Sequence, residues 1–129
     1  MTMFTPDAAF SGFSVDDTDA ARTFYADVLG LTVIDNPMGF LELELSSGAR
    51  VLLYTKPNHE PASYTVLNFP VTDIDAAVDD LRARGVETKI YADEEFATDE
   101  RGVMRGGGYG PDIAWFTDPA GNVLAVLQP

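Results

Sequence analysis

The sequence contains one internal repeat, in which Phe13-Ser-Val-Asp-Asp17-Thr-Asp-Ala-Ala21 returns as Phe69-Pro-Val-Thr-Asp73-Ile-Asp-Ala-Ala77. Each copy predicts a strand that ends at an N-capped helix. Gly30 and Gly85 then end the two helices before a further strand, and each copy closes with a predicted hairpin. The repeating unit is therefore strand, helix and three more strands. A chain of 129 residues holds two such units in one domain.

Hydrophobic periodicity predicts which side of each element is buried. An apolar stripe follows the helical period in both copies, after the N-cap residues Asp17 and Asp73. The strand before each helix alternates, so that Phe13 and Val15 are expected to face the first helix. The opposite strand face is more mixed, as expected of a cavity lining. It carries Phe10, Gly12 and Ser14 in the first copy and Tyr64, Val66 and Asn68 in the second.

Composition excludes several classes of partner. The formal net charge of −13 repels nucleic acid and anionic membrane, whereas a cationic or neutral small ligand is easier to accommodate. The same charge also serves simple solubility. The chain has no cysteine, no apolar run of membrane-spanning length and no signal-peptide pattern at its start. A cytoplasmic location is the resulting expectation.

Several motifs together resemble the vicinal oxygen chelate superfamily, which includes glyoxalases, bleomycin-resistance proteins, fosfomycin-resistance enzymes and extradiol dioxygenases. They are the two Asp-x-x-x-Ala helix starts, Phe24-Tyr25, Leu29-Gly30-Leu31 and Asp118-Pro-Ala-Gly-Asn122. The resemblance implies an α+β fold of two tandem βαββ modules, whose curved mixed sheets enclose a cleft, and often a homodimer. We expect a single domain over 1–129, with modules over about 8–57 and 64–128 and a linker over about 56–63.

The resemblance also implies where a catalytic metal would be held. In enzymatic members, His, Glu or Gln side chains from the first and last strands of each module bind a divalent cation. The matching positions here are all hydrocarbon, namely Phe10, Leu52, Val66 and Ala125. We therefore expect no metal site of the usual kind and no cofactor.

Three side chains are candidates for acid–base chemistry. His59, the single histidine, lies between prolines in the linker, and it is interpreted either as an exposed linker side chain or as an acid or base at the rim of the cleft. Strand alternation places Tyr54 on the cleft side, with an aromatic wall and one hydroxyl. It also places Glu42 and Glu44 there, either to hold a cation or simply to remain solvated at a sheet edge.

The second module adds further ligand-binding candidates. Trp115 and Met104 are interpreted as apolar lining, with Trp115 also a possible binding anchor. The long segment 91–111 is acidic and then glycine-rich around Tyr109, as in loops that close over a ligand. Arg105 is expected either to pair with local acids or to grip a ligand carboxylate. The predicted ligand-binding set is Phe10, Tyr54, Tyr64, Val66, Asn68, Tyr91, Met104, Arg105 and Trp115.

Three functions are consistent with these features. The first is a metal-free protein that sequesters or carries a small organic molecule, possibly cationic. The second is a metal-independent lyase or isomerase, with His59, Tyr54 or Glu42 as acid or base. The third, a metal-dependent glyoxalase-like lyase or dioxygenase, is disfavoured by the four hydrocarbon positions. Fold alone does not choose among them.

Overall fold

Two compact units, Met1–Glu60 and Pro61–Pro129, make up the chain. The computed structural model describes residues 4–91 and 97–129. The first unit contains η1 (Pro6–Ala8), β1 (Ser11–Val15), α1 (Thr18–Arg22), η2 (Thr23–Val28), β2 (Thr32–Asp35), β3 (Leu41–Glu44) and β4 (Arg50–Thr55). The second contains β5 (Thr65–Pro70), α2 (Ile74–Ala83), β6 (Val103–Met104), β7 (Asp112–Thr117) and β8 (Val123–Gln128). The division between the units falls inside the segment 56–63 that was predicted as a linker.

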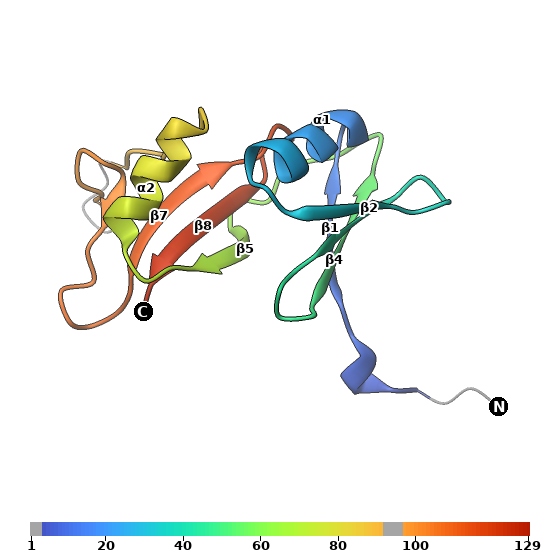
Figure 1. Cartoon of the computed structure of the whole chain (residues 1–129), viewed down its shortest axis with the longest axis horizontal. Coiled ribbons are helices and arrows are strands. Elements are labelled where there is room, and N and C mark those ends of the chain that lie inside the picture. Colours follow the sequence, from blue (N-terminus) through green and yellow to red (C-terminus); the bar gives the residue numbers. More distant parts are fainter. Residues whose placement is uncertain (1–3, 92–96) are drawn as a thin grey trace. The chain divides into compact units, whose positions relative to one another are not determined.

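Each unit is built on one four-stranded mixed sheet with the same topology. The strand orders are β1-β4-β3-β2 and β5-β8-β7-β6. In both sheets the first strand pairs in parallel with the last, and the remaining pairs are antiparallel. Within each unit the helical segment lies against one face of its sheet (Figure 1). The α+β fold of two tandem βαββ modules is therefore confirmed.

Both predicted helix starts are confirmed in atomic detail. The Asp17 carboxylate accepts hydrogen bonds from the backbone N–H groups of Asp19 and Ala20. The Asp73 carboxylate accepts one from Ala76. These bonds satisfy N–H groups that the first turn of a helix otherwise leaves without partners.

The first helix differs from its predicted regular form, because a π-helical segment, η2, follows α1 directly. The Leu29 N–H donates to the Phe24 carbonyl, which is an i to i+5 bond. Phe24 and Tyr25 are both buried, and their rings meet edge to face at a centroid distance of 5.1 Å. The wider turn allows two adjacent aromatic side chains to enter the same core.

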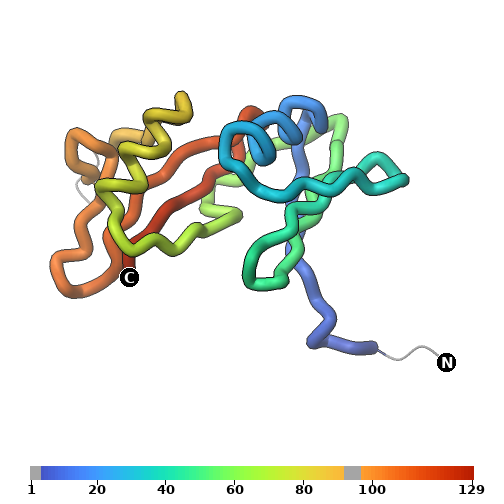
Figure 2. The backbone as a smooth tube through the Cα atoms, in the orientation of Figure 1, coloured from blue at the N-terminus to red at the C-terminus, as the bar shows by residue number. Residues whose placement is uncertain are grey.

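The second module also departs from the prediction at the strand expected after Val86. That segment forms no strand in the described part of the chain, and one backbone bond joins it to β7, from Lys89 N–H to the Trp115 carbonyl at 2.8 Å. The edge of β7 pairs instead with β6, which lies farther along the connection between α2 and β7 (yellow to orange in Figure 2). The expectation of a strand at this point was wrong.

The Asp118-Pro-Ala-Gly-Asn122 motif forms the turn between β7 and β8. Asp118 and Asn122 are both buried, and the Asp118 carboxylate accepts from the Asn122 backbone N–H at 2.8 Å and from its side-chain amide at 3.1 Å. Gly121 has a φ of 86°, which favours glycine. The turn thus supplies its own partners for buried polar groups. No helix in the described residues has the length and apolarity needed to cross a membrane.

Candidate functional site

The first sheet has one buried face and one open face, as strand alternation predicted. The buried side chains lie on the helix side and include Phe13, Val15, Leu41, Leu43, Val51 and Leu53. The opposite face, called here the first open face, carries Gly12, Ser14, Glu42, Leu52 and Tyr54. Register aligns these residues across the sheet, because Leu52 lies opposite both Gly12 and Glu42, and Ser14 lies opposite Tyr54.

His59 is attached to the first open face through Ser14. The Ser14 hydroxyl oxygen lies 2.6 Å from the Nδ1 atom of His59 in a hydrogen bond, and the His59 backbone N–H donates to the Lys56 carbonyl. Both side chains are half-buried. This hydrogen bond holds the His59 side chain beside the sheet, and its role as an acid or base at the rim of the cleft stays a prediction. Ser14 was missing from the predicted site residues, although strand parity had already placed it on this face.

The remaining first-unit candidates are more exposed. Glu42 is 28% exposed at its side chain, and Nη1 of Arg50 lies 4.0 Å from its carboxylate. Glu44 is exposed, as its alternative interpretation expected. Tyr54 is 36% exposed, and Phe10, which precedes β1, is 69% exposed. Glu42 and Tyr54 lie on the same face of the sheet, whereas Phe10 lies beyond the end of its strand.

The second sheet likewise has an open face, defined by Thr65, Asn68, Met104, Trp115 and Ala125. Asn68 and Trp115 flank Ala125 across three strands, and Met104 lies opposite Ile113. The Trp115 indole N–H donates to the Thr65 hydroxyl at 3.1 Å, which fixes the plane of the indole. This second open face brings together three of the predicted ligand-binding residues.

An aromatic pair continues this face. The Tyr91 ring meets the Trp115 ring edge to face at a centroid distance of 5.6 Å. The Lys89 ammonium lies 6.0 Å from the centre of the Tyr91 ring, within the range of a cation–π interaction. Residues 92–96 follow immediately, so part of the acidic segment predicted as a closing loop lies outside the described residues.

Thr65 takes the place that was predicted for Val66. The pairing of β5 with β8 shifts between Thr65 and Leu67, so that Thr65 lies opposite Val123 and Asn68 opposite Ala125. Val66 is the extra residue of this irregularity, and a bulge reverses the side-chain parity before it. Tyr64 precedes the strand and is 71% exposed. No residue in this segment of the sequence indicates a bulge. Strand alternation alone therefore placed Val66, and not Thr65, on this face of the sheet.

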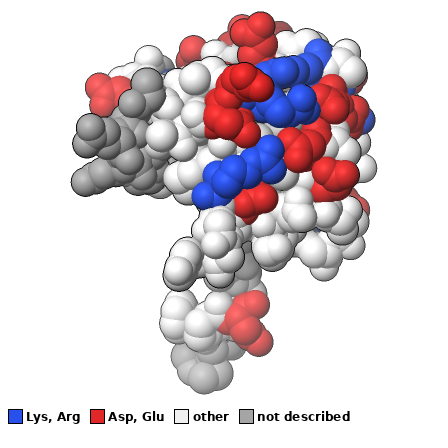
Figure 3. Space-filling view, turned by 90° about the vertical axis from the view of Figure 1, so that its left-hand side faces the viewer, with Lys and Arg blue, Asp and Glu red and all other residues white. Residues whose placement is uncertain are grey.

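Arg105 lies in a network of ion pairs with local acids, as the first of its two interpretations expected. Its guanidinium contacts Asp75 at 2.8 Å, Asp99 at 3.3 Å and Asp112 at 3.7 Å. Arg101 pairs with Asp75 at 3.3 Å and also with Asp79. Figure 3 shows Lys and Arg side chains surrounded by acidic ones on the surface of the second unit.

The network shifts the pKa values of Asp75, Asp99 and Arg105. The hydrogen bond from Arg105 lowers the pKa of Asp75, and the same bond raises the pKa of Arg105. Partial desolvation opposes ionisation of Asp99, but hydrogen bonds from the Val103 and Arg101 backbones and from Arg105 outweigh it and lower the pKa of Asp99. All of these groups are thus held in their charged forms at neutral pH.

The glycine-rich part of the loop between β6 and β7 is anchored at its base. The Gly106 N–H donates to the Asp112 carboxylate at 2.8 Å, and Tyr109 N–H donates to the Gly106 carbonyl. Tyr109 at the tip is fully exposed. Closure of this loop over a ligand stays a prediction.

The residues at the family's metal positions do not fit a metal. Phe10, Leu52, Val66 and Ala125 have no metal-binding atoms in their side chains, and Ala125 is completely buried. Thr65, which lies in the place predicted for Val66, has a neutral hydroxyl that accepts from the Trp115 indole. In the residues that the structure describes, no group of three or more His, Cys, Asp or Glu side chains is arranged to hold a metal ion.

Comparison with protein families gives a decisive result. Residues 9–126 match the model of the Glyoxalase/Bleomycin resistance protein/Dioxygenase superfamily. The chain belongs to this superfamily. A search of curated proteins found no match to this chain.

Solved structures of superfamily members share the fold. A superfamily member from Sphaerobacter thermophilus has 22% identity and a TM-score of 0.69, over 94% of this chain and 97% of the other. TnmS3, an antibiotic binding protein from Streptomyces, has 26% identity and a TM-score of 0.65, over 94% and 95%. The fosfomycin resistance protein FosX from Listeria monocytogenes has 12% identity and a TM-score of 0.70, over 100% and 95%. These structural neighbours include an antibiotic binding protein and a fosfomycin resistance protein.

Proposed function

We propose that this superfamily member binds a small organic molecule on the open faces of its sheets without a metal. The observation that carries the proposal is that the positions assigned to metal ligands by the family resemblance, Phe10, Leu52, Val66 and Ala125, are all hydrocarbon. Thr65, which the bulge puts in the place of Val66, has only a neutral hydroxyl, and this hydroxyl already accepts from the Trp115 indole. Such a surface retains a molecule by apolar contact and a few oriented polar groups. TnmS3, described as an antibiotic binding protein, is similar over most of its length.

The proposed ligand contacts differ between the two open faces. Trp115 and Tyr91, with Met104 beside them, supply an aromatic and apolar surface, and Asn68 adds a polar group. Tyr54 and the carboxylate of Glu42 lie on the first open face, and the carboxylate favours a cationic group on the ligand. The more exposed Phe10 and Tyr64, the half-buried Val66 and Arg105 remain proposed contacts from the sequence. A homodimer and a cytoplasmic location complete this proposal.

Retained ligands and metals are the direct test. Mass spectrometry of compounds released from the purified protein, with calorimetric titration of nickel, zinc and iron, separates binding from metal chemistry. We expect a retained organic molecule and no tight metal binding. Stoichiometric, tight binding of any of these transition metals would contradict the proposal.

A screen can use the single tryptophan, Trp115, as its reporter. Fluorescence titration with cationic and neutral aromatic compounds should identify ligands that contact the second open face. Calorimetry should then show about tenfold weaker binding or more for Trp115→Ala, because stacking on an aromatic anchor contributes about 1–3 kcal/mol. Phe4→Ala, which removes a ring that is 91% exposed and belongs to neither open face, is the matched control and should bind normally.

The hydrogen bond between Ser14 and His59 favours one alternative, a metal-independent lyase or isomerase. In that case His59 transfers a proton and Ser14 orients its ring, as oriented imidazoles do in general acid–base catalysis. The test is turnover of candidate substrates by wild-type and His59→Gln protein. Turnover that His59→Gln reduces at least a hundredfold would establish this alternative, and unchanged turnover would exclude it for His59.

A further inference from the structure

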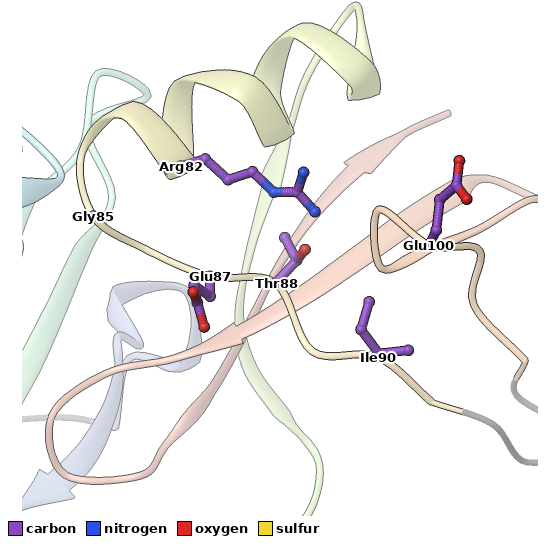
Figure 4. A pocket seen from close by; sticks show the side chains of 6 residues that line it. All are labelled: Arg82, Gly85, Glu87, Thr88, Ile90 and Glu100. Carbon is purple, nitrogen blue, oxygen red and sulfur yellow. The ribbon is translucent and has the colours of Figure 1, made fainter.

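A pocket of about 510 Å³ lies in the second unit beside the C-terminal end of α2. It is lined by Arg82, Gly85, Glu87, Thr88, Ile90 and Glu100 (Figure 4). Small-molecule sites commonly have volumes of about 300–1,000 Å³. None of the residues proposed above for ligand binding lines this pocket, so it is a separate feature.

Close contacts fix the walls of this pocket. The Thr88 hydroxyl donates to the Arg101 carbonyl at 2.6 Å, which ties the segment after α2 to the turn that carries Glu100. A Cβ atom on Gly102 would lie 2.6 Å from the same hydroxyl oxygen, so the two segments approach as closely as glycine allows. A pocket whose walls are already joined loses little freedom when a ligand enters.

Arg82 is the positively charged residue among those that line this pocket. Among the described residues, every other arginine lies within 4.0 Å of a carboxylate, namely Arg22, Arg50, Arg84, Arg101 and Arg105. Arg82 makes no ion pair with any described residue, although the chain has 21 acidic residues. An available guanidinium on a pocket wall is suited to a ligand carboxylate, which it binds through two parallel hydrogen bonds.

The other pocket residues specify the rest of the ligand. Arg82 and Glu100 extend from opposite sides of the pocket, with Ile90 between them, whereas the Glu87 carboxylate is directed away from Arg82 (Figure 4). Ile90 is 58% exposed and offers an apolar surface. A simple anion would be repelled by the net charge of −13, and a simple cation would leave Arg82 without a partner.

We propose that this pocket binds a small zwitterion of the amino-acid type with an apolar side chain. The carboxylate of the ligand pairs with Arg82, its ammonium pairs with Glu100, and its side chain packs on Ile90. The ligand is neutral overall, so binding adds no net charge to an acidic protein.

The test uses L-leucine as the probe, with two analogues that each lack one charge, 4-methylpentanoate and 3-methylbutylamine. Titrations followed by two-dimensional NMR should show leucine-dependent shifts at the backbone N–H groups of Thr88 and Ile90. Each analogue should bind about tenfold more weakly or worse, because each loses a charge-assisted contact. An analogue that binds as tightly as leucine would overturn the zwitterion assignment.

Matched variants locate the site. Arg82→Gln and Glu100→Gln should each weaken leucine binding about tenfold or more. Arg84→Gln is the control, because Arg84 lies on the same end of α2 but pairs with Asp80 at 3.1 Å. Equal binding by wild-type and Arg82→Gln protein, or shifts confined to the open faces, would refute the proposal. Circular dichroism of each variant verifies that the fold is kept.

Discussion

Single hydrogen-bonding side chains determine how the functional groups of both open faces are presented. Ser14 holds His59 beside the first sheet, and Thr65 holds the indole of Trp115 against the second. Each hydroxyl comes from the first strand of its module. The small polar residues of these strands therefore position the larger groups that we propose for binding or catalysis.

Replacement of Ser14 by alanine tests this role. We expect Ser14→Ala to lower the free energy of unfolding by about 0.5–1.5 kcal/mol, because a half-buried hydrogen bond to His59 is lost. Urea unfolding followed by circular dichroism measures the change. Ser46→Ala, in the exposed turn between β3 and β4, should be neutral. Equal effects of the two substitutions would show that the Ser14–His59 bond adds no stability.

Gly102 offers a second residue-scale prediction. Gly102 and Gly107 both have positive φ values, 79° and 62°, but only an added Cβ at Gly102 meets other atoms. Gly102→Ala should therefore cost about 1–3 kcal/mol more than Gly107→Ala, since it adds overpacking to the same backbone strain. Thermal and urea unfolding of the two variants give the comparison. A larger loss in Gly107→Ala would contradict the described packing around Thr88.

At the scale of elements, the ion pairs of Arg101 and Arg105 connect α2 to the segment 99–112. Asp75 belongs to α2, whereas Asp99 and Asp112 belong to the long connection and to β7. Among the described residues of the connection the one strand is the short β6, and these pairs add to its attachment. Exposed pairs of this kind contribute little singly and more as a network.

This network predicts a specific dependence on pH. Because the folded-state pKa of Asp75 lies below its usual value near 3.8, its contribution to stability is complete above that value and is lost as the pH falls through the folded pKa. Asp75→Asn should lower the melting temperature at neutral pH and flatten its decline below about pH 4. Asp27→Asn, at an exposed position without an ion pair in the described residues, should do neither. The same decline in melting temperature below about pH 4 for wild-type and Asp75→Asn protein would contradict the prediction.

Local patterns predicted most elements but not their irregularities. The capping aspartates, the helix-ending glycines and both hairpins follow from short-range chemistry, so the sequence was sufficient for them. The π-helical turn at Phe24-Tyr25 and the bulge before Leu67 depend on packing between distant residues. Because of the same bulge, strand alternation did not place Thr65 on the second open face. Trp115 and Tyr91 could be proposed from the sequence because large aromatic side chains are common in binding surfaces.

The charge of the whole molecule gives a further prediction. A formal net charge of −13 implies self-repulsion that weakens the folded state at low ionic strength. Raising sodium chloride from about 10 to 150 mM shortens the screening length from about 30 to 8 Å and should raise the melting temperature. Asp27→Lys, which removes two units of this charge, should reduce the dependence on salt. A melting temperature that falls with added salt would show that attractive ion pairs dominate instead.

The order of strands has a consequence for folding of the protein during its synthesis on the ribosome. Sheet β1-β4-β3-β2 has all its strands once residue 55 has been made. In the described part of the chain, however, β5 pairs with β8 alone, so it stays unpaired from residue 70 until residue 128. At translation rates of about 5–20 residues per second, that delay is roughly 3–12 s. During this interval the nascent β5, which carries Leu67 and Phe69, is a target for chaperones and for neighbouring nascent chains.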